Sequence, residues 1–180
     1  MPAYTVQERM IDAVINHKDV VDRTTIPYYK MLTETFISRH RDEVNWNAIS
    51  NFTELSEEFI EHFGKRINWK AIHKNCYLSE RFVQKHYRRL NMKEVLKKRG
   101  YSEDIHNKLI REEIMTINEI LEIDTQNVNE KTIKSFITQV DFVKLLKSKT
   151  ELSDKFKKDF DYELSIANNI IKDELIGTAG

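Results

Sequence analysis

Apolar and polar residues along the chain follow a pattern with a period of about 23 residues, a length typical of helical repeat proteins. Trp46 returns as Trp69, and the triplet Leu55-Ser56-Glu57 returns as Leu78-Ser79-Glu80, both at this interval. In such proteins each repeat is one small unit of secondary structure. The register extends over four units, so we predict four helical repeats across residues 21–112.

Each unit contains two polar residues of the kind that begins helices. They are Asp22 and Thr33, Asn45 and Ser56, Asn68 and Ser79, and Asn91 and Ser102. Their side-chain oxygens can accept from the free N–H groups of a first helical turn, and apolar residues before and after each cap form a hydrophobic staple. The pattern therefore predicts two short helices in each unit. Helices this short are marginal alone, so the units must stack on one another.

Several positions refine this prediction. The apolar positions predict that Trp46, Trp69 and the phenylalanines of the second helices are buried between units. Glu57, like Glu80 and Glu103, follows the serine cap, where the helix dipole favours negative charge. Gly64 and Gly100 are expected to end helices in the left-handed conformation.

The two ends of the chain are less regular. Residues 1–20 predict a capping helix, which begins at a Thr5…Glu8 capping box. Residues 113–180 predict degenerate helical repeats and a C-terminal helix, and residues 113–139 match the register poorly. The predicted fold is all-α: stacked helix-turn-helix repeats of about 23 residues with capping helices at both ends, expected to be continuous as one domain.

Composition narrows the setting of the protein. Cys76 is the single cysteine of the 180 residues, so an intramolecular disulfide is excluded. The N-terminus lacks the apolar core of a secretory leader, and no apolar run approaches the roughly 20 residues that span a bilayer. We therefore expect a cytoplasmic protein without membrane association.

One pattern resembles that of a known group of proteins. Asn45-Trp46-Asn47-Ala48-Ile49-Ser50 followed by Leu55–Ile60, and again Asn68–His73 followed by Leu78–Val83, resembles short helical repeats of accessory proteins from large T-even-like bacteriophages and some giant viruses. The resemblance extends roughly from position 40 to position 110. It implies a viral product acting in the bacterial cytoplasm on a host complex, and it transfers no functional residue.

The sequence offers little for catalysis or metal binding. Four glycines cannot supply a phosphate-binding loop. A nucleophile pair of His73 and Cys76, or a metal site that adds His62 and His86, lacks the convergent groups or paired spacings that such sites need. We predict a non-enzymatic protein with no cofactor, no metal and no small-molecule substrate.

Charge is segregated although the net charge is zero. Residues 65–99 contain twelve bases against Glu80 and Glu94, whereas residues 42–61 hold six acids and no Lys or Arg, and residues 102–130 hold eight acids and two bases. The candidate binding residues are Lys65, Arg66, Lys70, Lys74, Arg81, Lys85, Arg88, Arg89, Lys93, Lys97, Lys98 and Arg99. We call residues 65–99 the basic segment.

Two interpretations of the basic segment stay open. Its charges either pair with neighbouring units and with solvent, or they bind a partner. Tyr77, Tyr87 and His86 among the bases favour nucleic acid, because aromatic rings stack on bases. The acidic flanks favour a protein. The leading hypothesis is a protein-binding module, an adaptor or inhibitor that engages a host complex; the alternative is a nucleic-acid-associated regulator.

Overall fold

The computed structural model describes residues 5–124, 127–148 and 150–177, which form helices and their connections without a strand. The predicted all-α class is confirmed for these residues. Contacts divide the chain into two compact units, residues 1–91 and 92–180. The predicted boundaries after residues 20 and 112 stay predictions.

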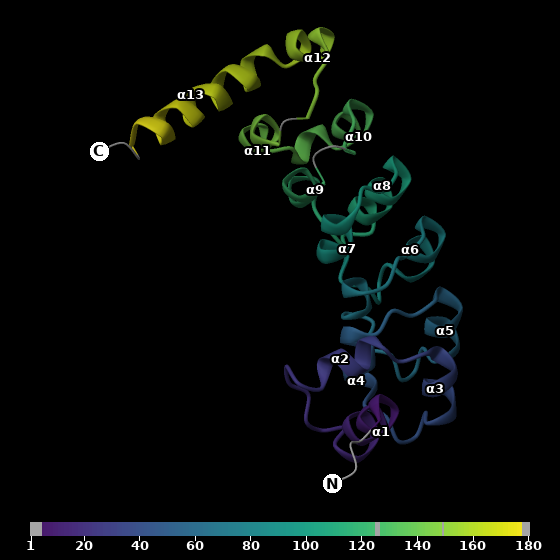
Figure 1. Cartoon of the computed structure of the whole chain (residues 1–180). Coiled ribbons are helices and arrows are strands. Elements are labelled where there is room, and N and C mark those ends of the chain that lie inside the picture. Colours follow the sequence, from purple (N-terminus) through teal and green to yellow (C-terminus); the bar gives the residue numbers. More distant parts are fainter. Residues whose placement is uncertain (1–4, 125–126, 149, 178–180) are drawn as a thin grey trace. The chain divides into compact units, whose positions relative to one another are not determined.

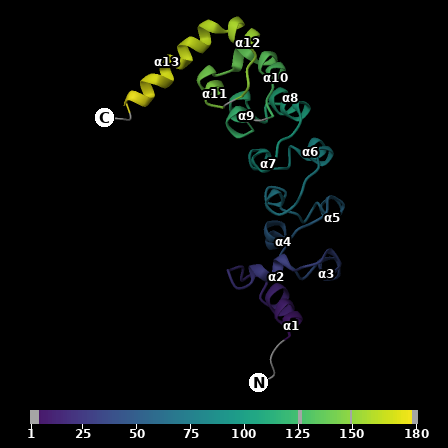
Figure 2. The ribbon, with the colours of Figure 1, turned by 45° about the horizontal axis from the view of Figure 1, so that its top comes forward.

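The first unit places its helices in two rows (Figures 1 and 2). One side holds α2 and α4, with η2 in contact with α4, and the other side holds α3, α5 and α6. In chain order the helices are α1 (Val6–Ile11), the π-helix η1 (Asp12–Asn16), α2 (Ile26–Lys30), α3 (Glu34–Arg39), α4 (Trp46–Phe52), α5 (Glu57–His62), the 3-10 helix η2 (Ile72–Lys74) and α6 (Glu80–His86).

The second unit repeats this order of contacts. Helix α9 contacts both α7 and α11, while α8 contacts α10, and α13 packs on α11 and α12. The helices are α7 (Met92–Lys98), α8 (Glu103–Arg111), α9 (Ile117–Ile123), α10 (Glu130–Ser135), the 3-10 helix η3 (Ile137–Gln139), α11 (Phe142–Lys147), α12 (Asp154–Asp159) and α13 (Asp161–Gly177).

Side-chain caps begin most of these helices where the sequence predicts them. The Asn45 side chain accepts from the N–H of Ala48 at 3.0 Å, and Ser56 and Ser79 each accept from the N–H three residues ahead at 3.2 Å. Thr5 and Glu8 form the predicted capping box of α1. The caps therefore follow from local sequence alone.

In two of the predicted 23-residue repeats, the first helix differs from the prediction. The Asp22 carboxylate accepts from the N–H groups of Thr24 and Thr25, at 2.8 and 3.2 Å, and also from the Thr24 hydroxyl at 2.7 Å. These bonds hold a side-chain turn that competes with helix, so α2 begins only at Ile26, with Pro27 in its first turn. After Asn68 the chain forms turns and the short 3-10 helix η2.

The two predicted glycine caps are wrong. None of the described glycines has a positive φ. A Cβ on Gly64 would lie 3.2 Å from the Trp69 ring, and a Cβ on Gly100 would lie 1.8 Å from the Asn127 amide nitrogen. A Cβ at position 64 would also be tight against the Glu61 carbonyl oxygen at 3.2 Å, and a Cβ at position 100 would require the Asn127 side chain to move.

Residues 113–124 and 127–139 form helices and turns despite the poor match of this region to the repeat register. Thr116 begins α9 through a capping box with Glu119, and Asn129 caps α10 by accepting from Thr132 at 2.9 Å. The connection before α9 includes Glu113, which has a left-handed φ of 56°. The cap spacing lengthens here, because Thr116 follows Asn91 at a longer interval than the one that separates Asn91 from Asn68.

Carboxylates next to the caps connect successive second helices. Glu34 accepts from the N–H of Ser56 at 2.6 Å. Glu57 accepts from the N–H of Ser79 and from its hydroxyl, the latter at 2.9 Å, and Glu130 does the same for Ser153, with its hydroxyl at 3.0 Å. The Ser153 N–H lowers the pKa of the Glu130 carboxyl. Each acid thus braces the helix start that follows it, a role beyond the predicted dipole effect.

Aromatic side chains fill the space between the two rows. Trp69 is 7% exposed, and its ring stacks on Phe82 with centroids 5.9 Å apart and lies 4.8 Å from the His86 ring. Trp46 is half-buried, with Phe63 at 5.0 Å. The predicted burial of these rings is confirmed for Trp69 and in part for Trp46. His86 therefore packs among these rings.

The second unit buries a histidine beside a carboxylate. His106 is fully buried, and its Nε2 lies 2.9 Å from the carboxylate of Asp124, which is 5% exposed. Asn127 donates to the other Asp124 oxygen at 2.7 Å. A buried carboxylate needs such partners, since burial without them is costly. Asp124 therefore joins α8 to the end of α9.

Candidate binding surfaces

The basic segment is divided between the two units. Eight of the twelve bases, from Lys65 to Arg89, belong to the first unit, and the four from Lys93 to Arg99 belong to the second. The contacts of each group decide how many of these charges remain available for a partner.

Arg89 is used to hold Trp69 in place. The Trp69 indole N–H donates to the carbonyl of Gly64 at 2.8 Å, and an Arg89 N–H donates to the same oxygen at 2.9 Å. The guanidinium carbon also lies 3.8 Å from the Trp69 ring centroid, a cation–π geometry. Arg89 therefore bridges two turns of its own unit.

Arg66 makes the corresponding contact at the preceding tryptophan. Trp46 and Arg66 both donate to the carbonyl of Arg41, at 2.8 and 2.5 Å. Arg66 also pairs with Asp42 at 2.5 Å, and its guanidinium lies 5.8 Å from the Trp46 ring centroid. A base of the basic segment thus meets an acid of the acidic flank.

Three lysines of the first unit are also engaged within it. Lys85 lies 2.9 Å from a carboxylate oxygen of Glu61, Lys70 donates to the carbonyl of Leu90 at 2.8 Å, and Lys74 donates to the Asn51 side chain at 2.7 Å. Hydrogen bonds from His86 and then Lys85 lower the pKa of the Glu61 carboxyl. These lysines connect segments that lie about one repeat apart in the sequence.

The bases of the second unit have acids or rings nearby. Lys97 pairs with Glu94 at 2.8 Å, and the Arg99 guanidinium lies 4.9 Å from the Tyr101 ring centroid. The pKa of Glu119 is lowered first by the Thr116 backbone N–H, and the charge of Lys93 lowers it further. Lys98 is exposed.

The remaining bases are Lys65, Arg81 and Arg88. Lys65 and Arg81 are exposed and make no hydrogen bond or ion pair with the residues that the structure describes. Arg88 donates to the Tyr87 hydroxyl at 3.1 Å, and its guanidinium lies over that ring. The geometry therefore favours the interpretation in which much of the basic segment pairs inside the chain.

The histidines and the cysteine that were considered for a catalytic or metal site differ in their exposure to solvent. His73 and Cys76 are buried, whereas His62 is exposed. Over the described ranges, no three His, Cys, Asp or Glu side chains come together as metal ligands would.

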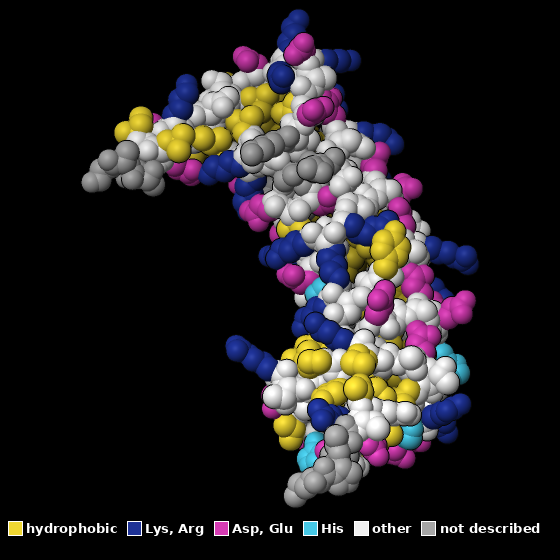
Figure 3. Space-filling view, in the orientation of Figure 1, with side chains coloured by type: hydrophobic (Ala, Val, Ile, Leu, Met, Phe, Trp, Pro, Cys, Tyr) yellow, Lys and Arg dark blue, Asp and Glu magenta, His cyan; other side chains and the backbone are white. Residues whose placement is uncertain are grey.

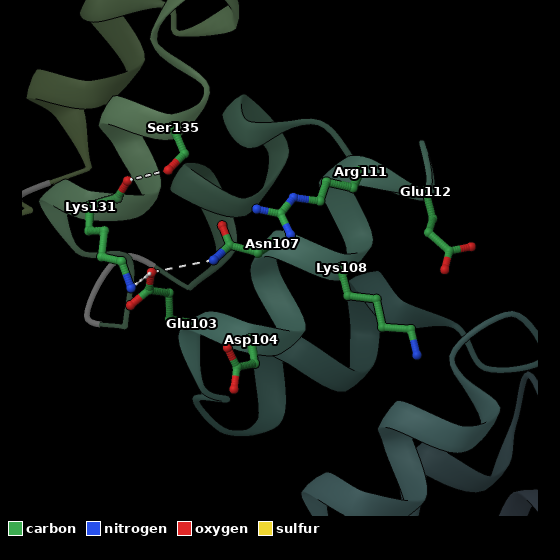
Figure 4. A pocket seen from close by; sticks show the side chains of 8 residues that line it. All are labelled: Glu103, Asp104, Asn107, Lys108, Arg111, Glu112, Lys131 and Ser135. Carbon is green, nitrogen blue, oxygen red and sulfur yellow. Dashed lines mark hydrogen bonds and ion pairs between the residues drawn. The ribbon is translucent and has the colours of Figure 1, made fainter.

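A hollow of about 370 Å³ lies between α8 and α10 (Figure 4). Lys131 and Asn107 reach toward Glu103, at 3.2 and 3.4 Å, and Lys108 and Glu112 point away from it. The lining contains three bases and three acids: Lys108, Arg111, Lys131, Glu103, Asp104 and Glu112. This balance favours no charged ligand.

We compared the chain with known proteins. No protein-family model, curated protein or solved structure matches it. The resemblance to phage proteins therefore stays a prediction, and the geometry of the chain is the basis for its function.

Helix α13 carries a surface that the sequence analysis missed. Tyr162, Ile166 and Ile170 are 75%, 44% and 43% exposed, while Leu164 and Ala167, on the other side of the helix, are 7% and 2% exposed. Figure 3 shows hydrophobic side chains at the surface along α13. Their four-residue spacing in the sequence was the available signal. We call Tyr162, Ile166 and Ile170 the α13 stripe.

Across the described part of the chain, every helix is too short or too polar to cross a membrane, and α13 itself has 17 residues. Contiguous exposed apolar side chains on a helix of this kind mark interaction sites.

Proposed function

We propose that the protein is a non-enzymatic binding module that engages another protein through the α13 stripe. The observation that carries the proposal is the exposure of Tyr162, Ile166 and Ile170 on a helix whose opposite side is already packed on α11. Apolar side chains lined up on one helix face are the usual means by which a helix binds a protein groove or another helix.

The contacts of the basic segment support a protein partner over nucleic acid. Arg66, Lys85 and Lys97 are paired with carboxylates, and Arg89 is occupied by a carbonyl and a ring. Phosphate binding relies on bases that can be offered to the backbone of the nucleic acid. In keeping with the resemblance to phage proteins, the proposed module acts as an adaptor or inhibitor on a host complex in the cytoplasm.

Affinity capture from an extract of the natural host cell tests the proposal. We expect the chain to retain specific proteins and the double variant I166S/I170S to lose them, because it removes the centre of the α13 stripe. Both positions are at least 43% exposed, so the fold should persist, which circular dichroism checks.

Two matched variants act as controls. Asn168→Ala changes an exposed polar residue elsewhere on α13, and the charge reversal R81E/R88E removes exposed bases. Both should retain the captured proteins. Capture that survives I166S/I170S, or that depends on Arg81 and Arg88 instead, would refute the proposal.

A further inference from the structure

We infer that the partner of the α13 stripe is an amphipathic helix that brings a basic side chain to Asp173. This inference rests on the proposed function and specifies the chemistry of the partner at the same surface. It follows from the charges placed on and beside the α13 stripe.

The α13 stripe is long enough to seat a helix. Tyr162, Ile166 and Ile170 recur at intervals of four residues, so they lie above one another on one face. The 17 residues of α13 extend over about 25 Å at 1.5 Å per residue. Leu164 and Ala167 are committed to the opposite side, so a partner helix need not displace any packing of the chain.

Asp173 lies on the same face as the stripe. It follows Ile166 by seven residues and Ile170 by three, which are the spacings of neighbours on a helix surface. Its side chain is exposed, and within the described residues it has no hydrogen bond or ion pair. An occupant of the stripe would cover this carboxylate, and covering an unpaired charge is unfavourable unless the partner supplies a cation.

The edge of the stripe is acidic as well. Glu163 precedes Ile166 by three residues and Ile170 by seven, and it too is exposed. Lys172 follows Ile170 by two residues, so it points to a different face. Glu174 is paired with Lys147 at 2.6 Å. The charge that a partner meets along the stripe is therefore negative.

This charge pattern disfavours a second copy of the chain as the occupant. A parallel pair of α13 helices would bring Asp173 to Asp173, and an antiparallel pair would bring Asp173 toward Glu163. Like charges held together across an interface oppose association. Anionic surfaces such as phosphate-bearing polymers are disfavoured for the same reason, which leaves a basic helix of another protein.

Three synthetic peptides, each as long as α13, test the inference with the full chain. All three are designed as helices: one has an isoleucine stripe flanked by Lys, one has the same stripe flanked by Glu, and one has Lys flanks with the isoleucines replaced by Ser. Binding is measured by fluorescence anisotropy. We expect the first peptide to bind at least about tenfold more tightly than the second, because charges across an interface govern partner choice.

Variants of the chain test which residues of α13 are responsible for peptide binding. Asp173→Asn should weaken binding of the Lys-flanked peptide about fivefold and reduce the difference in affinity between the Lys-flanked and Glu-flanked peptides. Lys172→Gln should change neither affinity. I166S/I170S should abolish binding of both. The serine peptide should not bind.

The outcomes separate this inference from the proposed function. Equal affinity for the Lys and Glu peptides, or no change with Asp173→Asn, would refute the basic partner. So would association of the chain with itself through the α13 stripe in sedimentation. If no peptide binds while capture from host extract still depends on Ile166 and Ile170, the inference fails and the proposed function stands. If capture ignores those residues, both fail.

Discussion

Replacing Trp69 with alanine should destabilise the first unit by about 3–5 kcal/mol, the range for removing a large buried aromatic side chain. The ring is 7% exposed and contacts Phe82 and His86. Its N–H bond to Gly64 and its cation–π contact with Arg89 would be lost together. One substitution thus removes packing and two polar contacts between turns.

Urea unfolding followed by the fluorescence of Trp46 measures this loss, since Trp46 becomes the only tryptophan of the variant. Met31→Ala is the matched control, because Met31 is 55% exposed in the same unit and should change stability by less than about 0.5 kcal/mol. A loss below about 1 kcal/mol for Trp69→Ala would mean that the ring does not hold the rows together.

Glu57→Ala should destabilise the first unit by about 1–2 kcal/mol, because the carboxylate accepts two hydrogen bonds from Ser79 and bonds to charged acceptors are the stronger kind. Glu58 provides a close control. It lies in the same first turn of α5, so its effect on the helix dipole is similar, but it is exposed. Glu58→Ala should change stability by only a few tenths of a kcal/mol.

The comparison of these two variants separates the contribution of the Glu57–Ser79 hydrogen bonds from that of the helix dipole. Tryptophan fluorescence in urea again gives the free energy of unfolding. If Glu57→Ala and Glu58→Ala lose the same small amount, the dipole accounts for the acid after the cap, and the bond to Ser79 contributes nothing measurable.

Local features of the fold could be predicted from sequence because they depend on a few neighbouring residues. The caps at Asn45, Ser56 and Ser79 involve an N–H only three residues away, and the capping box of Thr5 and Glu8 is equally local. These caps determine where successive helices begin along the chain. The start of α2 was missed for a local reason too, since the turn at Asp22 outcompeted the helix.

Contacts between segments could not be predicted in the same way. Glu57 reaches Ser79 and Arg89 reaches Gly64 over 22 and 25 residues, and composition alone does not specify which base meets which acid. The role of Gly64 was misassigned because it depends on close contacts with the Trp69 ring and with the carbonyl oxygens of Ile60 and Glu61. The α13 stripe was missed because Leu164 and Ile166 both read as apolar, and only packing decides which side is covered.

We propose that the charges of the basic segment largely serve the fold and that the chain binds protein and not nucleic acid. The direct test is the binding of wild-type chain to labelled duplex and single-stranded oligonucleotides between about 50 and 200 mM salt. We expect weak binding with little dependence on salt. Micromolar or tighter affinity with a steep log–log salt slope, lost when Arg81, Arg88, Lys97 and Lys98 are reversed to Glu, would contradict it.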